Sequence, residues 1–545
     1  MSGKRLHASV AGGCMHRRRL MHATAQLPQH APSFYNTTVR LSSARSSAML
    51  TRGAFGNLVN RYRAVLDKCR LINAFGSLAV AAMLVAGGAA SAEGAVDDRP
   101  YWAISSSEVT SEDINYDGDA ARIVYAQGAE LPSGSSVGTY TFTGDRISFK
   151  TVADYPTLYD DEGKVTRSGN VVGFQASSFK SGLIPQINVG SPDKRVESVS
   201  IDVTNTGVDG FASGIWAYGS KNGDGGQINI FADTLSVKAH SEKDWVYGIY
   251  AQNCTTTSNG TLAAINIDAG KTYVDVTAGD PSKAIAIVAM SQGRMNIAGD
   301  LYVNTRGGVG TAIVARGNAE IIINKSGTDT VQMNGDIDFN YHDRSSGTDV
   351  DAVVDVTLSG ADSYWNGNTT VSWGESNKPD DEKLSVSGMT LGLVDGAVWT
   401  PTRVAESDTS AASGTMYAPV NNLNMNNGVI NLNPDVDVQV DNMTGSGTVN
   451  LAANIKEGEH VGTLYAYTAK DASLNVNMTG VTSDDITAAQ ARKLMSSVSA
   501  GEGDLAVTGS VAEGLVNGAM NIGTDGTVSM GKNHVMESAL EIASI

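Results

Sequence analysis

Two groups of residues have types and spacings that could do chemistry, and the first is a serine motif. Gly134-Ser-Ser136-Val-Gly138 fits the pattern G-x-S-x-G, in which a serine on a strand-to-helix turn is activated by a histidine. Residues 139–143 alternate like a strand, so the required helix is not predicted. None of the four histidines after residue 92 falls in a catalytic pattern. We therefore predict no catalytic residue and no enzyme.

The second group could bind a cation. Asp113, Asn115, Asp117 and Asp119 stand at alternate positions with Gly118 between the last two, as in the first half of a calcium loop. The twelfth position, which should be Glu, is Val124. Asp, Asn and Gly also make ordinary turns. Calcium therefore stays a candidate, and no other cofactor is expected.

Aromatic side chains could form a binding face instead of a reactive site. The candidates recur at neighbouring positions of two repeats: Trp216, Tyr218, Trp245, Tyr247 and Tyr250. Outward rings could stack on sugars or peptides, whereas inward rings would fill the core. Trp216 and Tyr250 lie between Ile and Ala positions expected to face the core, so the outward orientation stays open beside the core-filling one.

The elements that position these residues are strands. The chain has 60 Gly and 12 Pro among 545 residues, and Val, Ile and Thr occur in short alternating runs with little helical periodicity. Three strand-like elements recur in fixed order. Their first copies are Gly214-Ile-Trp-Ala217, Gln186-Ile-Asn-Val189 and Ser200-Ile-Asp-Val203. Third-element copies at Ile201, Val237, Val274 and Val303 are 36, 37 and 29 residues apart.

Such drift in period is tolerable where each repeat stacks on the next and insertions enter outer loops. We therefore predict an all-β fold, a right-handed parallel β-helix or solenoid, rather than a propeller. Alternate residues such as Ile228 and Ile230 should point inward and stack between repeats, while Asn229, Asn266 and Asn296 point outward.

The N-terminal segment has the features of an export signal. A short apolar run from Ala79 ends at Ala90-Ser-Ala92, after several basic residues, which predicts cleavage after Ala92. Residues 1–92 carry twelve Lys/Arg and one acid, Asp67, which gives them a net charge of +11. The whole chain has a net charge of −18, so residues 93–545 carry −18 − 11 = −29. The acidic part argues against nucleic acid as a partner.

Two alternatives concern this leader. Residues 1–48 could be a mitochondrial presequence, or the true start could be Met49. Cys14 and Cys69 fall in the leader, so Cys254 would be alone after cleavage. Such sparse cysteine usage suits a bacterial envelope protein better than a secreted eukaryotic one.

Later segments resemble a known family. Glycine-marked strands at residues 358–368, 389–401 and 422–432 look like the C-terminal part of the passenger domain of pertactin-like autotransporters, and residues 440–451 resemble its capping region. Residues 533–545 resemble the start of the linker helix, with Asn533 as N-cap. The resemblance implies a membrane barrel afterwards, which the sequence to Ile545 does not contain.

These observations predict five segments and one leading function. The segments are a leader (1–92), an N-terminal β region (93–195), β-helix repeats (196–360), a C-terminal β-helix and capping region (361–532) and a linker-helix start (533–545). The leading hypothesis is a non-enzymatic, monomeric passenger or adhesin, exported by a Sec-type route through the periplasm. After export it would stay at the cell surface, attached to the outer membrane through a separate barrel, or it would be released into the medium. Its partner would be a host or bacterial surface protein or glycan. A polysaccharide lyase or glycosidase is the alternative.

Overall fold

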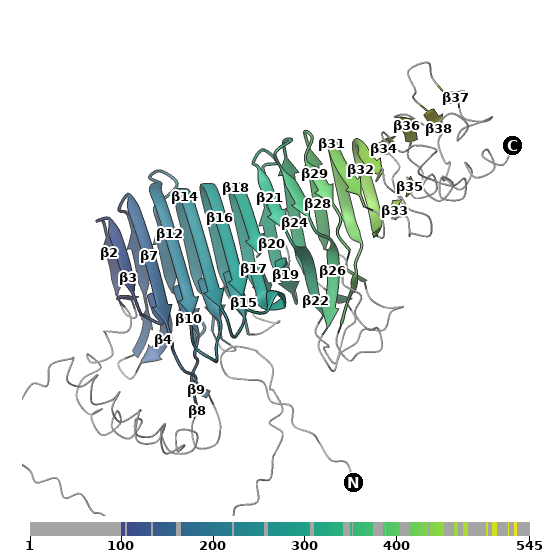
Figure 1. Ribbon diagram of the computed structural model, residues 1–545. Coiled ribbons are helices and arrows are strands. Elements are labelled where there is room, and N and C mark those ends of the chain that lie inside the picture. The colour runs from purple at the N-terminus through teal and green to yellow at the C-terminus, as the bar shows by residue number, and fades with distance from the viewer. Residues whose placement is uncertain are drawn as a thin grey trace, which may run out of the picture. The chain divides into compact units, whose positions relative to one another are not determined.

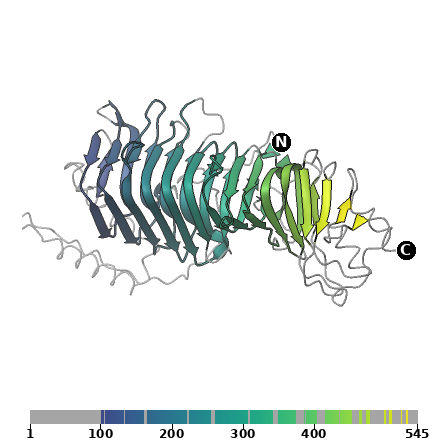
Figure 2. The same cartoon turned by 90° about the horizontal axis from the view of Figure 1, so that it is seen from above.

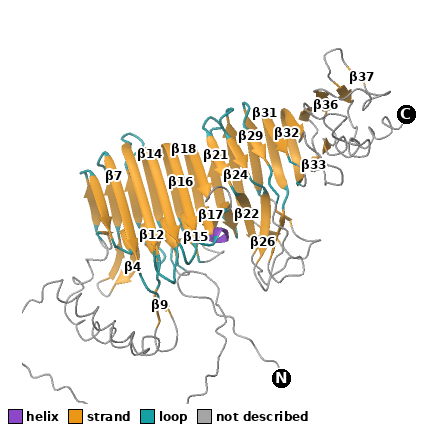
Figure 3. Cartoon of the chain, in the orientation of Figure 1, coloured by secondary structure: helices purple, strands orange, loops and turns teal. Residues whose placement is uncertain are grey.

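The computed structural model describes part of the chain, and most of that part is strand (Figure 3). The described residues are 100–103, 106–131, 134–159, 165–220, 223–254, 260–305, 310–341, 349–350, 352–373, 385–386, 388–403, 414–433, 436–451, 463–466, 472–477, 498–499, 504–508, 521–522 and 528–530. The predicted leader, its cleavage site and the linker-helix start lie outside these residues.

One sheet, here called the short-strand sheet, takes one strand from each repeat. Its strands are parallel except that β5 pairs antiparallel with β4 and β30 pairs antiparallel with β26. In pairing order they are β1 (Tyr101–Ala103), β4 (Arg122–Leu131) with β5 (Gly134–Val137), β10 (Val171–Ser178), β13 (Ala212–Gly219), β15 (Val246–Asn253), β17 (Ala284–Met290), β19 (Thr311–Arg316), β22 (Asp336–Tyr341), β26 (Thr369–Trp373) and β30 (Gly414–Tyr417).

A second sheet, the long-strand sheet, takes the other two elements of each repeat. They are continuous strands in β14, β16, β18, β31 and β32, and they are separate strands in the repeats before β14 and in those between β18 and β31 (Figure 1). Its strands are β2 (Ser107–Thr110), β3 (Ile114–Gly118), β6 (Thr139–Phe142), β7 (Arg146–Ala153), β11 (Gln186–Val189), β12 (Val196–Asn205), β14 (Gln227–Ser241), β16 (Ala264–Ala278), β18 (Arg294–Thr305), β20 (Glu320–Ile323), β21 (Val331–Asn334), β24 (Val353–Ser359), β25 (Tyr364–Asn366), β28 (Met389–Val394), β29 (Val398–Thr400), β31 (Val420–Leu432), β32 (Asp437–Leu451), β33 (Thr463–Ala466), β34 (Ala472–Asn477), β35 (Val498–Ser499), β36 (Asp504–Thr508), β37 (Asn521–Ile522) and β38 (Val528–Met530).

The remaining elements are small. β23 (Asp349–Val350) pairs with β27 (Ser385–Val386), and one 3₁₀ turn spans Pro281–Lys283. β8 (Leu158–Tyr159) and β9 (Val165–Arg167) form an antiparallel pair that belongs to a separate compact unit.

The predicted repeats pair in register, as the sequence indicated. In the short-strand sheet Ile215 pairs with Ile249, and Ile249 pairs with Ile287, in both cases between parallel strands. In the long-strand sheet Ile228 pairs with Ile265 and Val237 with Val274. Ile228 and Ile230 are buried, whereas Asn266 and Asn296 are exposed, so the predicted inward and outward sides are confirmed. Figure 2 shows the same succession of strands from above.

Both sheets contribute to one hydrophobic core. Ile215 from one sheet and Val237 from the other belong to the same buried cluster. The sheets approach closely at glycines of the short strands: a Cβ on Gly214 would lie 2.2 Å from a methyl carbon of Val237, and one on Gly248 would lie 2.5 Å from a methyl carbon of Val274. The first residue of the recurring Gly-Ile-aromatic-Ala element is therefore glycine because the facing valine takes the space of a side chain.

Candidate binding surface

The serine motif lies on strands rather than on a strand-to-helix turn. Gly134–Val137 forms β5 against β4, and the next element is strand β6, so the predicted absence of a following helix is confirmed. His240 lies in β14, where its Nε2 is 3.3 Å from a carboxylate oxygen of Glu242. His342, His460 and His534 lie outside the described residues.

The calcium candidate does not form a loop. Asn115 and Asp117 lie in the extended strand β3, which pairs with β7. Asp113 accepts hydrogen bonds from the backbone N–H groups of Asp145 and Arg146, and Asp117 pairs with Lys150 at 3.2 Å. Because alternate residues of a strand are about 6.6 Å apart, these side chains and Asp119 cannot surround one ion. Within the described ranges, no group of three His, Cys, Asp or Glu residues could hold a metal.

The outward aromatic face is corrected by the structure. Trp216, Tyr218, Tyr247 and Tyr250 are buried, and among the five candidates Trp245 alone is exposed, at 38%. Trp216 and Tyr250 do lie on the face opposite the core residues Ile215 and Ala217, but this face is covered. Burial raises the pKa of the Tyr218 phenol to about 12. The four buried rings are therefore not available to a ligand.

The physical reason is that the aromatic rings pack on one another. Phe211 contacts Trp216 edge-on with ring centroids 5.0 Å apart and Tyr247 at 5.2 Å, and Tyr247 lies 4.8 Å from Tyr250. Such contacts stabilise by ring geometry and by removing large apolar areas from water. The Sγ of Cys254 lies 3.1 Å from the Tyr218 hydroxyl oxygen at the edge of this cluster.

Sequence reasoning missed two rows of outward side chains on the long-strand sheet. The first changes from charged to amide groups along the chain; by register it contains Asp117, Lys150, Asp202, Lys238, Asp275, Asn304, Asn334, Asn366, Thr400, Asn431 and Asn450. Its members are joined by side-chain hydrogen bonds, such as Asn304 to Asp275 at 2.9 Å and Asn366 to Asn334 at 2.9 Å. In the earlier copies, such as Ile201-Asp202-Val203 and Val274-Asp275-Val276, the polar residue stands between two aliphatic ones, and this was the available signal.

The second row lies two residues earlier on the same strands. Ser200 and Ser236 are followed by Tyr273, Tyr302 and then by Gln332 and Tyr364. The rings of Tyr273 and Tyr302 stack with centroids 4.8 Å apart and planes 13° apart. Tyr273 is 39% exposed. This part of the sheet therefore presents phenol and amide groups side by side.

A pair of acids lies on the short-strand sheet, which the sequence did not reveal. Asp336 and Asp338 are two residues apart in β22, so they share one face. Asp338 accepts hydrogen bonds from the hydroxyls of Thr370 and Ser372 on β26. Burial raises the pKa of the Asp338 carboxyl to about 6, and burial also raises the pKa of Asp336. A carboxyl that holds its proton near neutral pH can act as an acid.

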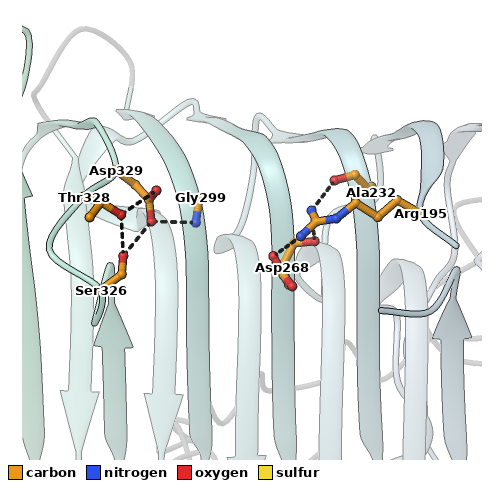
Figure 4. A network of polar contacts seen from close by, with 7 residues as sticks. All are labelled: Arg195, Ala232, Asp268, Gly299, Ser326, Thr328 and Asp329. Carbon is orange, nitrogen blue, oxygen red and sulfur yellow. Dashed lines mark hydrogen bonds and ion pairs between the residues drawn. The ribbon is translucent and has the colours of Figure 1, made fainter. Parts of the chain in front are cut away.

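Polar contacts also tie together the bends of the long-strand sheet (Figure 4). The Arg195 guanidinium, directly before β12, donates to the carbonyl oxygens of Ala232 at 3.1 Å and Asp268 at 3.0 Å, so it contacts the two following strands, β14 and β16. Asp329 accepts from the Gly299 N–H at 3.1 Å and from the Ser326 hydroxyl at 3.1 Å. These contacts hold adjacent repeats in register, and we assign them a structural role.

Comparison with known proteins adds no identification. Neither protein-family profiles, nor curated proteins, nor solved structures give a significant match to this chain. A search of the described residues for an apolar helix long enough to span a bilayer returns none.

Proposed function

We propose that this protein is an exported, non-enzymatic surface protein of a Gram-negative bacterium, of the kind formed by the passenger domains of autotransporters. The finer fold proposal is a right-handed parallel β-helix. In-register parallel pairing of successive repeats in both sheets supports it, together with the single core that the sheets share. The export signal ending at Ala92 supports delivery outside the cytoplasm.

The observation that carries the proposal is the outward face of the long-strand sheet. Its polar rows continue across successive repeats at the strand spacing of about 4.8 Å, while the alternate side chains, such as Val303 and Trp365, are buried. A long, regular scaffold with an ordered polar face is suited to display and to repeated weak contacts. An adhesin is the function that fits this surface.

Export is tested by expressing the full chain in a Gram-negative host. We expect cell fractionation and N-terminal sequencing to give a periplasmic or surface product that begins at Glu93. The variant A92L, in which a large residue replaces the small one before the cleavage point, should keep its leader. A full-length product that stays in the cytoplasm would contradict the proposal.

The alternative is a polysaccharide-active enzyme, and one observation favours it. Asp336 and Asp338 form a carboxyl pair of the general type that glycoside cleavage uses, and burial raises the pKa of both. Against it, both oxygens of Asp338 already accept hydrogen bonds from Thr370 and Ser372, and its side chain is buried. We therefore keep the binding function as the leading proposal.

A further inference from the structure

The two outward rows lose their charges in the later repeats. We call the neutral part the amide face and define it by Tyr302, Gln332, Tyr364, Asn334, Asn366, Thr400 and Asn431, on strands β18, β21, β25, β29 and β31. The alternate side chains in these strands, including Met333 and Trp399, are fully buried. This alternation fixes the amide face on the outside of the sheet.

The amides of this face keep hydrogen-bonding capacity after they have bonded to one another. Asn366 donates one N–H to the Oδ1 of Asn334 at 2.9 Å. Asn431 donates to the Oγ1 of Thr400 at 3.4 Å and accepts from Asn450 at 2.8 Å. A primary amide has two N–H donors and an oxygen with two lone pairs, so a ladder bond between neighbours uses only half of them. The rest suit a ligand with repeated hydroxyl groups.

The charge of the surface narrows the class of ligand that can bind. Earlier in the same row stand Lys150, Asp202, Lys238 and Asp275, but from β21 to β31 the two rows contain no Lys, Arg, Asp or Glu. An anionic polymer would need cations such as Arg or Lys to compensate its desolvation. The amide face therefore favours a neutral ligand.

The backbone of the sheet argues against a peptide. Peptides often bind sheets by adding a strand at a free edge. β21 pairs with β18 and β25, and β25 pairs with β29, so the strands beneath the amide face are hydrogen-bonded on both sides. Side chains alone form the contact surface. Their repeat of about one strand spacing, 4.8 Å, is close to the length of one sugar unit in an extended polysaccharide.

We infer that the amide face binds a neutral, linear polysaccharide that lies across the strands, with its hydroxyls on the Asn334 and Asn366 amides and its sugar rings against Tyr302 and Tyr364. This inference rests on the proposed function in one respect: the chain must be exported to meet a polysaccharide outside the cytoplasm. The contact is made by many small interactions, so affinity rises with the length of the glycan.

The test is affinity electrophoresis of the full chain in native gels that contain one polysaccharide each. The neutral probes are β-1,4-glucan, β-1,3-glucan, galactomannan and amylose, and the anionic probe is polygalacturonate. We expect at least one neutral glucan or mannan to retard the wild-type chain, and polygalacturonate to leave it unretarded. The double variant N334A/N366A should weaken retardation at least tenfold.

A matched control uses the equivalent ladder outside the amide face. Asn229 on β14 donates to Asn188 on β11 at 3.0 Å and accepts from Asn266 at 2.9 Å, so N188A/N229A loses bonds of the same kind. It should bind like the wild type, and thermal melting should show a loss of stability at least as large as that of N334A/N366A. Absence of retardation by every neutral probe, equal retardation by polygalacturonate, or an equal loss in the control would overturn the inference. None of these results affects the export test, which reads processing at Ala92.

Discussion

Trp399 stacks directly on Trp365 of the preceding repeat, with ring centroids 5.3 Å apart and planes 4° apart. Both rings are fully buried. Each indole N–H donates to a glycine carbonyl oxygen, that of Trp365 to Gly335 at 2.9 Å and that of Trp399 to Gly367 at 3.0 Å. The two repeats are therefore joined by the same side chain in the same position, with both its apolar and its polar groups satisfied.

Removing one of these rings should destabilise the stack strongly. We expect W399A to lower the free energy of unfolding by about 3–5 kcal/mol, because it leaves a cavity and an unpaired carbonyl group. W399F should cost less, since it keeps most of the apolar contact. Urea unfolding followed by circular dichroism measures both. The control W245A, at a ring that is 38% exposed, should cost less than either, and a larger loss there would contradict this account.

A pair of glycines separates steric clash from backbone preference. Gly299 and Gly360 have similar positive φ values, 88° and 84°. A Cβ on Gly299 would lie 1.6 Å from the Ala269 carbonyl oxygen, whereas a Cβ on Gly360 has nothing within 4 Å. We expect G360A to cost about 1–2 kcal/mol from the left-handed conformation alone, and G299A to cost clearly more. Equal thermal shifts for the two variants would refute the steric argument.

The pairing of repeats could be predicted from the sequence because the same aliphatic residues that recur along the chain are the ones that pair. Ile215, Ile249 and Ile287 recur with small neighbours at fixed offsets, and the structure pairs them. The burial of Trp216 could not be predicted in the same way. Alternation within a strand decides which face a side chain occupies, but not what packs against that face. Only the register of neighbouring strands brings Phe211, Trp216 and Tyr247 together.

The amide face and the acid pair were missed for a related reason. Asn334, Asn366 and Thr400 come from strands joined by loops of different length, so no fixed spacing marks them as one row. Asp338 stands in Ile-Asp-Phe, an ordinary alternating triplet. Its significance lies in Thr370 and Ser372 on the next strand and in the burial of the carboxyl.

The buried acid should make stability fall as the pH rises. The pKa of Asp338 is about 6 in the folded protein, above the value of about 3.9 for an unfolded chain, so the folded state holds the proton more tightly between these values. The carboxyl therefore imposes no penalty below about pH 4, and the penalty grows to about 3 kcal/mol once the pH has passed 6. Urea unfolding at pH 4.5 and 7.5 measures the difference.

The matched variant for this effect is D338N, which keeps the shape but does not ionise. We expect its stability to change less than that of the wild type over the same pH interval. Asp336 has a pKa raised by burial in the same direction, so D336N should remove a further part of the dependence. Identical pH profiles for wild type and D338N would show that Asp338 does not titrate in this range.

The same acid decides between binding and catalysis. If the chain binds glycans without cleaving them, the purified protein should release no reducing ends from the neutral polysaccharides or from polygalacturonate during long incubation. We expect this result because both Asp338 oxygens are already hydrogen-bonded to Thr370 and Ser372 and a buried carboxyl cannot reach a substrate. Chromatography of the products is the measurement. Cleavage by the wild type that D338N abolishes, while N334A/N366A keeps it, would place the active centre at the acid pair and replace the binding proposal with an enzymatic one.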